Sequence, residues 1–360
     1  MAQTPLDSMV SLTAPVRRLL DTATEAFRLQ TGKPTPFATP NTVVLDLKTM
    51  RLRDYSTERA TNGKEGALSI IVHAPFAGHD SVIADFHERQ SLMGCLKQHA
   101  GGKLFLIDWK SASDETKNFG IDEYLAEILV AVEHVGGRAH LIGLCQGGWA
   151  VAMFAARFPE KVASLVLAGA PMDLSAGDGP IKKAVQGLSP AFYRELVAMG
   201  GGYMRGAMML QGFKNMHPFE QYVDRYIKLY EHVEEPDYRE RIERFAGWFE
   251  HPIDLPGRWY LQVVQELFND NRFFNGEFQG LGRKLAVADI HCPVFLLAGH
   301  DDDITPPIQV HNATKRLGTP PDQVRSETVN GGHVGLFMSH KTVGTVWPEI
   351  AQWIRENDVP

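Results

Sequence analysis

The sequence predicts an α/β fold in which helices cover both faces of a mainly parallel β-sheet and a helical cap interrupts the core. Two observations carry this prediction. Apolar segments of strand length alternate with segments of helical periodicity through most of the 360 residues. The alternation stops near residue 176 and resumes at Pro293, and the region between is helical in pattern and rich in aromatic side chains.

The N-terminal segment, residues 1–35, is predicted to form a helical arm ahead of the core. Residues 16–29 place apolar side chains at helical spacing after Pro15, namely Val16, Leu19, Leu20, Ala23 and Phe27. We interpret this helix as packed on its own domain. The alternative is an arm that joins two copies of the chain into a homodimer.

The core is predicted to comprise residues 36–175 and 287–360. Its segments with strand character are 42–47, 50–55, 68–72, 103–108, 139–144, 163–169, 293–299 and 324–329. The first two are spaced as a hairpin, and helical segments such as 121–135 separate later ones. Strands joined through helices form a parallel sheet that is buried on both faces.

The helical cap is predicted at residues 176–286, between two strands of the core. We assign most of its many aromatic residues to the cap's own core and a few to an apolar tunnel or groove. Three consecutive glycines at 200–202 offer backbone freedom and are a predicted hinge.

The residues with the clearest chemical meaning are 143–147, which read Gly-Leu-Cys-Gln-Gly. They join an apolar strand to a helix-forming segment. A nucleophile at so sharp a turn takes a strained backbone conformation, so its neighbours two residues away must lack side chains. Gly143 and Gly147 meet this requirement and identify Cys145 as the predicted nucleophile. The alternative is a buried cysteine in a glycine-rich turn.

Two later segments supply the partners that a thiol needs. Three aspartates follow an apolar strand, and Asp302 best fits the pattern Gly-x-x-Asp-x-Ile-x-Pro, with Asp301 and Asp303 as alternatives. His333 lies on a glycine-flanked loop after the next strand. This order of nucleophile, acid and histidine is that of α/β-hydrolases. We predict Cys145 as nucleophile, His333 as general base and acid, and Asp302 as the carboxylate that orients it.

Further site residues are predicted around this triad. In this fold the loop after an early strand and the residue after the nucleophile donate backbone N–H groups to the oxyanion, which indicates Phe76 and Gln146. His79 and Trp109 are predicted to bind substrate, with a structural loop histidine and a core tryptophan as the respective alternatives. We interpret His73, directly after an apolar strand, as a structural histidine with satisfied hydrogen bonds.

Composition excludes several classes of protein. The net charge of −7 argues against nucleic-acid binding, and no run of 18 apolar residues could span a bilayer. Cys95, Cys145 and Cys292 include no Cys-x-x-Cys pair, so neither a disulfide framework nor a zinc site is indicated. We therefore expect no metal and no dissociable cofactor. The N-terminus lacks a basic-then-apolar signal sequence, which favours a cytoplasmic location.

The motifs resemble those of polyhydroxyalkanoate synthases and intracellular polyhydroxyalkanoate depolymerases, a branch of the α/β-hydrolases. The resemblance covers roughly residues 66–350. It is carried by Leu-Ile-Asp-Trp at 106–109, Asp122 with Tyr124, Gly-Leu-Cys-Gln-Gly-Gly at 143–148, Phe-Pro-Glu-Lys-Val at 158–162, Ala168 with Pro-Met-Asp at 171–173, Phe-Asn-Gly-Glu at 274–277, Asp-Asp-Ile-Thr-Pro at 302–306 and Gly-Gly-His-Val-Gly at 331–335. It implies Cys–His–Asp catalysis of acyl transfer on 3-hydroxyacyl esters or thioesters.

The two branches of this family make different predictions. Gly-Gly after Cys-Gln resembles the synthases, whereas Ala-Pro-Phe-Ala-Gly-His at 74–79 resembles a depolymerase loop and lacks the Tyr-x-x-Asp of synthases. We favour an intracellular polyhydroxyalkanoate (polyhydroxybutyrate) depolymerase or oligomer hydrolase acting on the polymer or its oligomers. The alternative is a synthase that uses 3-hydroxyacyl-CoA, and a further alternative is a non-catalytic granule-associated protein. An association with polyester granules in the cytoplasm is part of this prediction.

Overall fold

The computed structural model describes residues 14–56 and 67–358, so the first 13 residues of the predicted arm lie outside it. Contacts between residues group the chain into two compact units. The smaller unit joins the N-terminal segment through Thr35 with Gln211–His251, and the larger joins Pro36–Leu210 with the chain from Pro252 onward. Part of the predicted cap therefore groups with the predicted arm, and the division into arm, core and cap stays a prediction.

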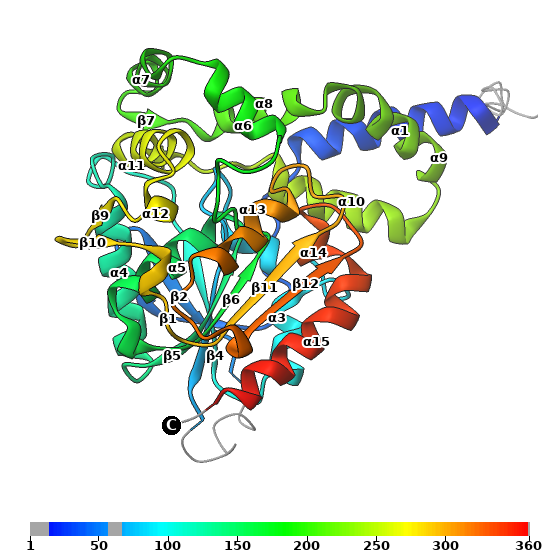
Figure 1. Ribbon diagram of the computed structural model, residues 1–360. Helices are drawn as coiled ribbons and strands as arrows, with labels where there is room; N and C mark the ends of the chain where they lie inside the picture. Colours follow the sequence, from blue (N-terminus) through cyan, green and yellow to red (C-terminus); the bar gives the residue numbers. More distant parts are fainter. Residues whose placement is uncertain (1–13, 57–66, 359–360) are drawn as a thin grey trace, which may run out of the picture. The chain divides into compact units, whose positions relative to one another are not determined.

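The larger unit is built on an eight-stranded sheet (Figure 1). In spatial order the strands are β1 (Thr42–Asp46), β2 (Met50–Asp54), β4 (Leu104–Trp109), β3 (Ser69–His73), β5 (Ala139–Leu144), β6 (Val162–Ala168), β11 (Val294–Gly299) and β12 (Val324–Val329). β1 and β2 pair antiparallel, as do β2 and β4, whereas the strands from β4 to β12 pair in parallel. The predicted mainly parallel sheet is confirmed.

The burial of the strands follows from their sequence. Every residue of β3, β4, β5, β6 and β11 is buried, as expected for apolar strands covered by helices on both faces. The end strands β1 and β12 are largely exposed. The carboxyl ends of the parallel strands meet at one edge of the sheet, and Cys145, Asp302 and His333 lie in the connections that follow β5, β11 and β12 there.

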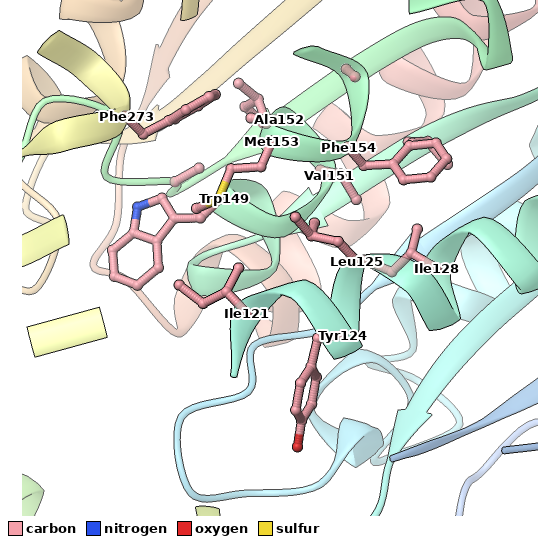
Figure 2. Packing of buried hydrophobic residues seen from close by; sticks show 14 of the residues in the cluster. Ile121, Tyr124, Leu125, Ile128, Trp149, Val151, Ala152, Met153, Phe154 and Phe273 are labelled. Carbon is pink, nitrogen blue, oxygen red and sulfur yellow. The ribbon is translucent and has the colours of Figure 1, made fainter. Parts of the chain in front are cut away.

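Helices of the larger unit flank the sheet (Figure 1). They are α3 (Leu92–His99), α4 (Ile121–His134), α5 (Gln146–Arg157), α13 (Pro307–His311), α14 (Gly335–Met338) and α15 (His340–Glu356). Ile121 and Leu125 of α4 belong to the same buried apolar cluster as Trp149 and Met153 of α5 (Figure 2). Packing of these two apolar helix faces against each other and the sheet fixes the position of α5, the helix that begins directly after Cys145.

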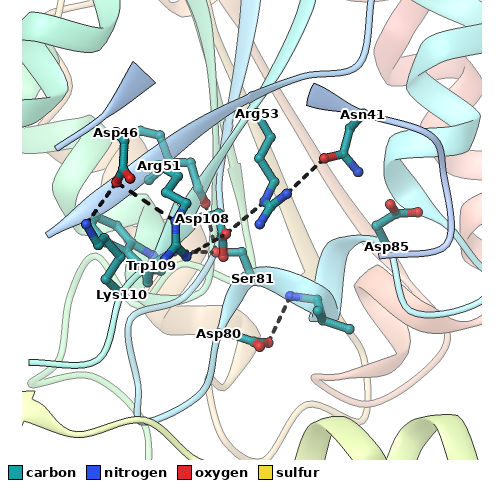
Figure 3. Close-up of polar contacts among 12 residues, drawn as sticks. Asn41, Asp46, Arg51, Arg53, Asp80, Ser81, Asp85, Asp108, Trp109 and Lys110 are labelled. Carbon is teal, nitrogen blue, oxygen red and sulfur yellow. Dashed lines mark hydrogen bonds and ion pairs between the residues drawn. The ribbon is translucent and has the colours of Figure 1, made fainter. Parts of the chain in front are cut away.

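A buried ion pair ties the β1–β2 hairpin to the parallel strands (Figure 3). Arg53 Nε lies 2.8 Å from the carboxylate of Asp108 near the end of β4, and Arg53 Nη1 donates to Asn41 at 3.0 Å. Burial raises the pKa of Asp108, although Arg53 and Arg51 act in the opposite direction. Asp108 therefore stabilises the sheet, and its neighbour Trp109 reaches a cavity described below.

The part of the predicted cap that belongs to the larger unit connects β6 to β11. Its elements are α6 (Pro180–Gly187), α7 (Pro190–Met199), β7 (Tyr203–Met204), β8 (Leu255–Pro256), α11 (Gly257–Gln262), the π-helical segment η4 (Val263–Asn269), α12 (Arg272–Asn275), β9 (Phe278–Gly280) and β10 (Arg283–Leu285). β7 pairs antiparallel with β8, and β9 with β10. Two short antiparallel pairings therefore hold together an otherwise helical region.

The three glycines at 200–202 form the turn between α7 and β7. Gly201 and Gly202 have φ values of 76° and 96°, a region that favours glycine. A Cβ atom at Gly200 would lie 2.1 Å from the carbonyl oxygen of Tyr203. The shape of the turn alone requires glycine at these positions, so their presence is no independent sign of the predicted hinge.

The smaller unit is helical. It contains α1 (Ala14–Thr31), η3 (Glu220–Asp224), α9 (Arg225–His232), α10 (Pro236–Phe249) and most of α8 (Gly206–Met216). Leu29, Leu229 and Ala246 form its apolar centre, and Arg18 pairs with Glu234 at 2.7 Å. The predicted N-terminal helix is confirmed, and the homodimer stays a prediction. Across the described residues of both units, no helix is long and apolar enough to cross a membrane.

Candidate active site

Cys145 lies at the turn between β5 and α5. β5 ends at Leu144 and α5 begins at Gln146, so Cys145 alone makes the turn. Its backbone has φ 52° and ψ −121°, a conformation that residues with a side chain rarely adopt. The strained strand–helix turn predicted from the sequence is therefore present.

Two glycines allow the chain to make this turn. A Cβ atom at Gly143 would lie 2.5 Å from the Cα atom of Gly148, and one at Gly147 would lie 2.2 Å from the carbonyl oxygen of His73. Both separations are shorter than any real Cβ contact, so side chains here would push α5 away from the sheet. This close approach is the physical reason for the Gly-x-Cys-x-Gly pattern.

His333 and Asp302 meet at the same edge of the sheet. His333 Nδ1 lies 2.7 Å from Asp302 Oδ2, and the other carboxylate oxygen accepts from the backbone N–H of Thr305 at 2.7 Å. Both residues are buried. Asp301 is exposed and pairs instead with His300, its neighbour in sequence, at 2.7 Å. Of the clustered aspartates, Asp302 is therefore the one placed against the histidine.

The surroundings of His333 favour its charged form. Burial of the ring would by itself lower its pKa. The negative charge of Cys145 and hydrogen bonds with Asp302 and Cys145 outweigh burial and raise the pKa of His333 to about 10. The histidine is therefore protonated at neutral pH. The structure brings the three predicted residues together, and their catalytic roles stay predictions.

A pocket adjoins Cys145, and we call it the Cys145 pocket. It is lined by Cys145, Gln146, Trp149, Pro171, Leu174, Ile181, Lys182, Phe268, Ile304, Thr305 and Gln309. Lys182 of α6 is the cationic side chain in this wall, and its Nζ donates to the carbonyl oxygens of Ser175 at 2.6 Å and Gly177 at 2.8 Å. Residues of α6 and η4 thus complete a pocket that begins at the sheet.

A second cavity, which we call the aromatic cavity, shares Gln146 and Trp149 with the Cys145 pocket. It is lined by His73, Phe76, Trp109, Ile121, Tyr124, Leu125, Gln146, Trp149, Ala150, Met153, Trp259, Val263 and Leu267. The Phe76 ring packs against Trp109 and Trp259 with centroid separations of 4.9 Å each. The cavity wall is therefore a rigid aromatic cluster.

The other predicted site residues lie in different places. Trp109 lines the aromatic cavity, and its indole N–H donates to the carbonyl of Ala74 at 2.9 Å. His79 is buried but is not among the residues that line either cavity. Gln146 opens α5, where backbone N–H groups have no acceptor within the helix. Phe76 follows β3 in the connecting loop. The substrate and oxyanion roles of these residues stay predictions.

His73 is not the satisfied structural histidine expected from the sequence. It ends β3 and is 1% exposed, yet neither ring nitrogen makes a hydrogen bond of acceptable geometry with any described residue. Burial lowers the pKa of His73 to about 3, and a backbone contact with Ala74 that falls short of this geometry acts in the opposite direction. The interpretation of this residue as satisfied is therefore wrong. The ring is a neutral polar group in an apolar wall.

His73 and Lys182 were not predicted as site residues, although each lines a cavity beside the predicted nucleophile. A polar residue at the carboxyl end of the buried apolar segment Ser69–His73 is a signal that could have identified His73. Lys182 belongs to no motif, because its place at the pocket depends on how α6 packs rather than on neighbouring residues.

The remaining cysteines have less reactive surroundings. Burial raises the pKa of the Cys95 thiol to about 11 and that of Cys292 to about 12. All three cysteines are free. Within residues 14–56 and 67–358, no group of three or more His, Cys, Asp or Glu side chains could hold a metal ion.

Relatives of this chain carry informative names. A family model described as "Protein of unknown function (DUF3141)" matches residues 53–359. The poly(3-hydroxyalkanoate) polymerase subunit PhaC of Haloarcula marismortui is 28% identical, over 88% of this chain and 68% of that protein. The subunits of the same name from Haloferax mediterranei (26%; 88% and 64%) and Thiocystis violacea (24%; 99% and 97%) are similar as well.

Solved structures show the same fold. A monoacylglycerol lipase of Paleococcus ferrophilus has a TM-score of 0.55 at 16% identity, covering 86% of this chain and 99% of that one. The enol-lactonase of Burkholderia xenovorans LB400 has a TM-score of 0.54 at 13% identity, covering 88% and 100%. The predicted α/β-hydrolase fold is confirmed. With the named relatives, it identifies the chain as an enzyme of the α/β-hydrolase class, acyltransferases included.

Proposed function

The chain belongs to the DUF3141 family, and from this premise, its polymerase-subunit relatives and the site geometry we propose that it transfers 3-hydroxyacyl groups from a thioester to a hydroxyl acceptor. This is the alternative of the sequence analysis. The relatives favour it over a depolymerase, because several of them are named as polymerase subunits. The observation that carries the proposal is the strained turn at Cys145 beside the His333–Asp302 pair.

The first half of the reaction forms an acyl-enzyme. The Cys145 sulfur attacks the carbonyl carbon of a 3-hydroxyacyl-CoA, and the backbone N–H groups of Phe76 and Gln146 stabilise the oxyanion. The bond between carbonyl carbon and CoA sulfur breaks, and protonated His333 gives its proton to the departing thiolate. The raised pKa of His333 suits this step, because the acid is charged before the substrate binds.

The second half transfers the acyl group to an acceptor. His333, now neutral, takes the proton of the acceptor hydroxyl, whose oxygen attacks the acyl-enzyme carbonyl and releases Cys145. If the acceptor is the 3-hydroxyl end of another hydroxyacyl chain, the chain grows by one unit. Asp302 holds the imidazole orientation throughout, because its carboxylate stays bonded to Nδ1.

Hydrolysis is the second candidate, since it differs only in using water as the acceptor. The residues Ala-Pro-Phe-Ala-Gly-His at 74–79, which resemble the loop of intracellular depolymerases, favour it. Both candidates require the same acyl-enzyme at Cys145. Under either candidate function we expect a cytoplasmic location, association with polyester granules and a homodimer.

Incubating the purified protein with 3-hydroxybutyryl-CoA decides between these candidates. We expect release of CoA with the acyl group recovered in oligomers or polymer. Recovery of free 3-hydroxybutyrate in equal amount to CoA would identify a hydrolase, and amorphous polyester tests the depolymerase directly. Cys145→Ala should stop both reactions, and Cys292→Ala, at a cysteine outside both cavities, is the matched control. No CoA release and no polyester cleavage by the wild type would refute acyl transfer at Cys145.

A further inference from the structure

Two side chains beside the nucleophile have buried polar atoms without a partner. Among the described residues, no group makes a hydrogen bond with either ring nitrogen of His73, which is 1% exposed, or with the buried Oε1 atom of the half-buried Gln146. Both residues line the aromatic cavity, whose other walls are almost entirely apolar. Buried polar atoms are nearly always hydrogen-bonded in folded proteins, so three unpaired ones on two residues that line one cavity indicate a ligand group that supplies missing bonds.

The backbone places this polar pair close to the predicted nucleophile. β3 pairs with β5 so that His73 stands opposite Gly143, two residues before Cys145. The carbonyl oxygen of His73 also contacts the first turn of α5, because it lies 2.2 Å from the position of a Cβ atom on Gly147. Gln146 directly follows Cys145 and lines both the Cys145 pocket and the aromatic cavity.

The chemistry of the pair matches a hydroxyl group. A neutral imidazole offers one N–H donor and one acceptor nitrogen, and the amide oxygen of Gln146 is an acceptor. A hydroxyl can accept from the imidazole N–H and donate to the amide oxygen, which pairs one ring nitrogen of His73 and the Oε1 atom of Gln146. A carboxylate would place its charge against the Gln146 oxygen, and an alkyl group would leave both atoms unpaired.

We propose that the aromatic cavity is the acyl subsite and that His73 and Gln146 bind the 3-hydroxyl group of the substrate there, selecting 3-hydroxyacyl over unsubstituted acyl groups. This inference rests on the proposed acyl transfer at Cys145. The carbonyl carbon sits at the sulfur and the oxyanion at the amide of Gln146, so the hydroxyl carbon, two bonds further along, reaches the Gln146 side chain. The apolar remainder of the acyl group faces Trp109, Tyr124 and Trp259.

The test compares acylation by (R)-3-hydroxybutyryl-CoA, its (S) enantiomer and butyryl-CoA, measured as CoA release and expressed as ratios of kcat/KM. We expect the wild type to prefer one hydroxylated enantiomer over butyryl-CoA by about 100-fold or more, because sites built to bind a hydroxyl reject analogues that lack it. His73→Phe and Gln146→Met should each lower this ratio at least about tenfold.

Two further variants separate a binding role from a structural one. His73→Gln restores a donor and an acceptor and should recover part of the ratio lost in His73→Phe. His311→Phe changes a histidine outside both cavities, which bonds Ser326 and Thr328, and should keep the wild-type ratio. A folding defect would lower the rates with all three substrates together, whereas loss of hydroxyl binding changes their ratio.

The outcomes distinguish this inference from the function it rests on. If CoA release does not depend on Cys145, the proposed function fails. If release depends on Cys145 but the wild type accepts butyryl-CoA as well as either hydroxylated enantiomer, only the hydroxyl subsite fails. An unchanged ratio in both His73→Phe and Gln146→Met would also overturn it.

Discussion

The pKa values of two buried histidines near Cys145 are shifted in opposite directions. His333, bonded to Asp302 beside Cys145, has its pKa raised to about 10, and His73 in the wall of the aromatic cavity has its pKa lowered to about 3. Burial lowers the pKa of both rings. The difference lies in their surroundings, because hydrogen bonds with Asp302 and Cys145 help to raise the pKa of His333, whereas no charged group raises the pKa of His73.

One edge of the sheet therefore carries two different kinds of polar site. The His333–Asp302 pair beside Cys145 holds a charge that the protein itself neutralises, so it is organised before any substrate arrives. The aromatic cavity contains a neutral ring whose nitrogens have no hydrogen-bond partner among the described residues and can take one from a ligand. We therefore assign bond making and breaking to the first site and recognition of the acyl group to the second. Each prediction below tests one side of this assignment.

Removing the nucleophile should have the largest effect. Cys145→Ala is expected to lower acyl transfer by roughly 10⁵-fold, to the background rate, since no acyl-enzyme can form. Cys145→Ser should retain little activity, because a hydroxyl loses its proton far less readily than a thiol and His333 is placed to serve a thiol. The measurement is CoA release from 3-hydroxybutyryl-CoA. Substantial activity in Cys145→Ala would place the chemistry elsewhere.

Selective alkylation gives an independent check of the nucleophile. Iodoacetamide reacts with thiolates, and burial raises the pKa of Cys95 to about 11 and of Cys292 to about 12. We expect Cys145, beside protonated His333, to be labelled first, as read by mass spectrometry of the digested protein. Earlier labelling of Cys95 or Cys292 would contradict the electrostatic difference drawn here.

Removing the charge partner of His333 should have the next largest effect. Asp302→Asn keeps the size of the side chain but cannot stabilise an imidazolium, and we expect kcat to fall by roughly 10³-fold. The pKa of His333 should fall too, which would shift the pH profile of the remaining activity. Asp303→Asn, at an exposed neighbour, is the matched control. Equal losses in both variants would mean that the cluster acts only through the fold.

The candidate catalytic residues could be predicted from the sequence, whereas the properties of the aromatic cavity could not. Cys145, Asp302 and His333 could be found because each sits in a local pattern of strand, glycine and turn. The unpaired state of His73 could not, because it depends on Trp109 occupying the carbonyl of Ala74 and on apolar side chains from helices and strands that are distant in the sequence. The preference for hydrolysis rested on one loop, and the named relatives favour acyl transfer to a hydroxyl instead.

The contributions of the two histidines to stability should also depend on pH in opposite directions. His333 has a raised pKa, so its contribution to stability is fully present below its unfolded value of 6.5 and is lost as the pH rises toward 10. His333→Gln should therefore flatten the fall in stability between pH 6.5 and 10. The difference in slope is at most about 1.4 kcal/mol per pH unit, measured as urea unfolding free energy.

His73 should act in the acid range. Its pKa is lowered to about 3 in the folded chain, whereas it is 6.5 in the unfolded chain. As the pH falls below 6.5, the unfolded chain binds a proton at this ring and the folded chain does not. The contribution of His73 to stability is therefore present above pH 6.5 and is lost as the pH falls toward 3. His73→Phe should flatten the fall in stability between pH 6.5 and 3 without altering the alkaline range. If both variants changed the same pH range, the two histidines would not differ as described.

The smallest expected effect is on the preference for acyl chain length. Variants at two adjacent residues of η4 distinguish the two cavities, because each residue lines a different one. Leu267 lines the aromatic cavity, whereas Phe268 lines the Cys145 pocket and packs edge-on against Trp149 at 5.4 Å. If the acyl chain occupies the aromatic cavity, Leu267→Ala should raise the relative rate with 3-hydroxyhexanoyl-CoA over 3-hydroxybutyryl-CoA by roughly three- to tenfold, since about two methylene groups gain room.

Phe268→Ala removes more volume but from the other cavity, so it should change that ratio less and alter KM for the acceptor or CoA portion instead. Leu267→Ala is also expected to cost about 2–5 kcal/mol of stability, because the side chain is buried, and thermal unfolding confirms that assays use folded protein. A larger chain-length shift in Phe268→Ala than in Leu267→Ala would place the acyl group in the Cys145 pocket. Recognition and chemistry would then share one cavity, and the unpaired His73 would need another explanation.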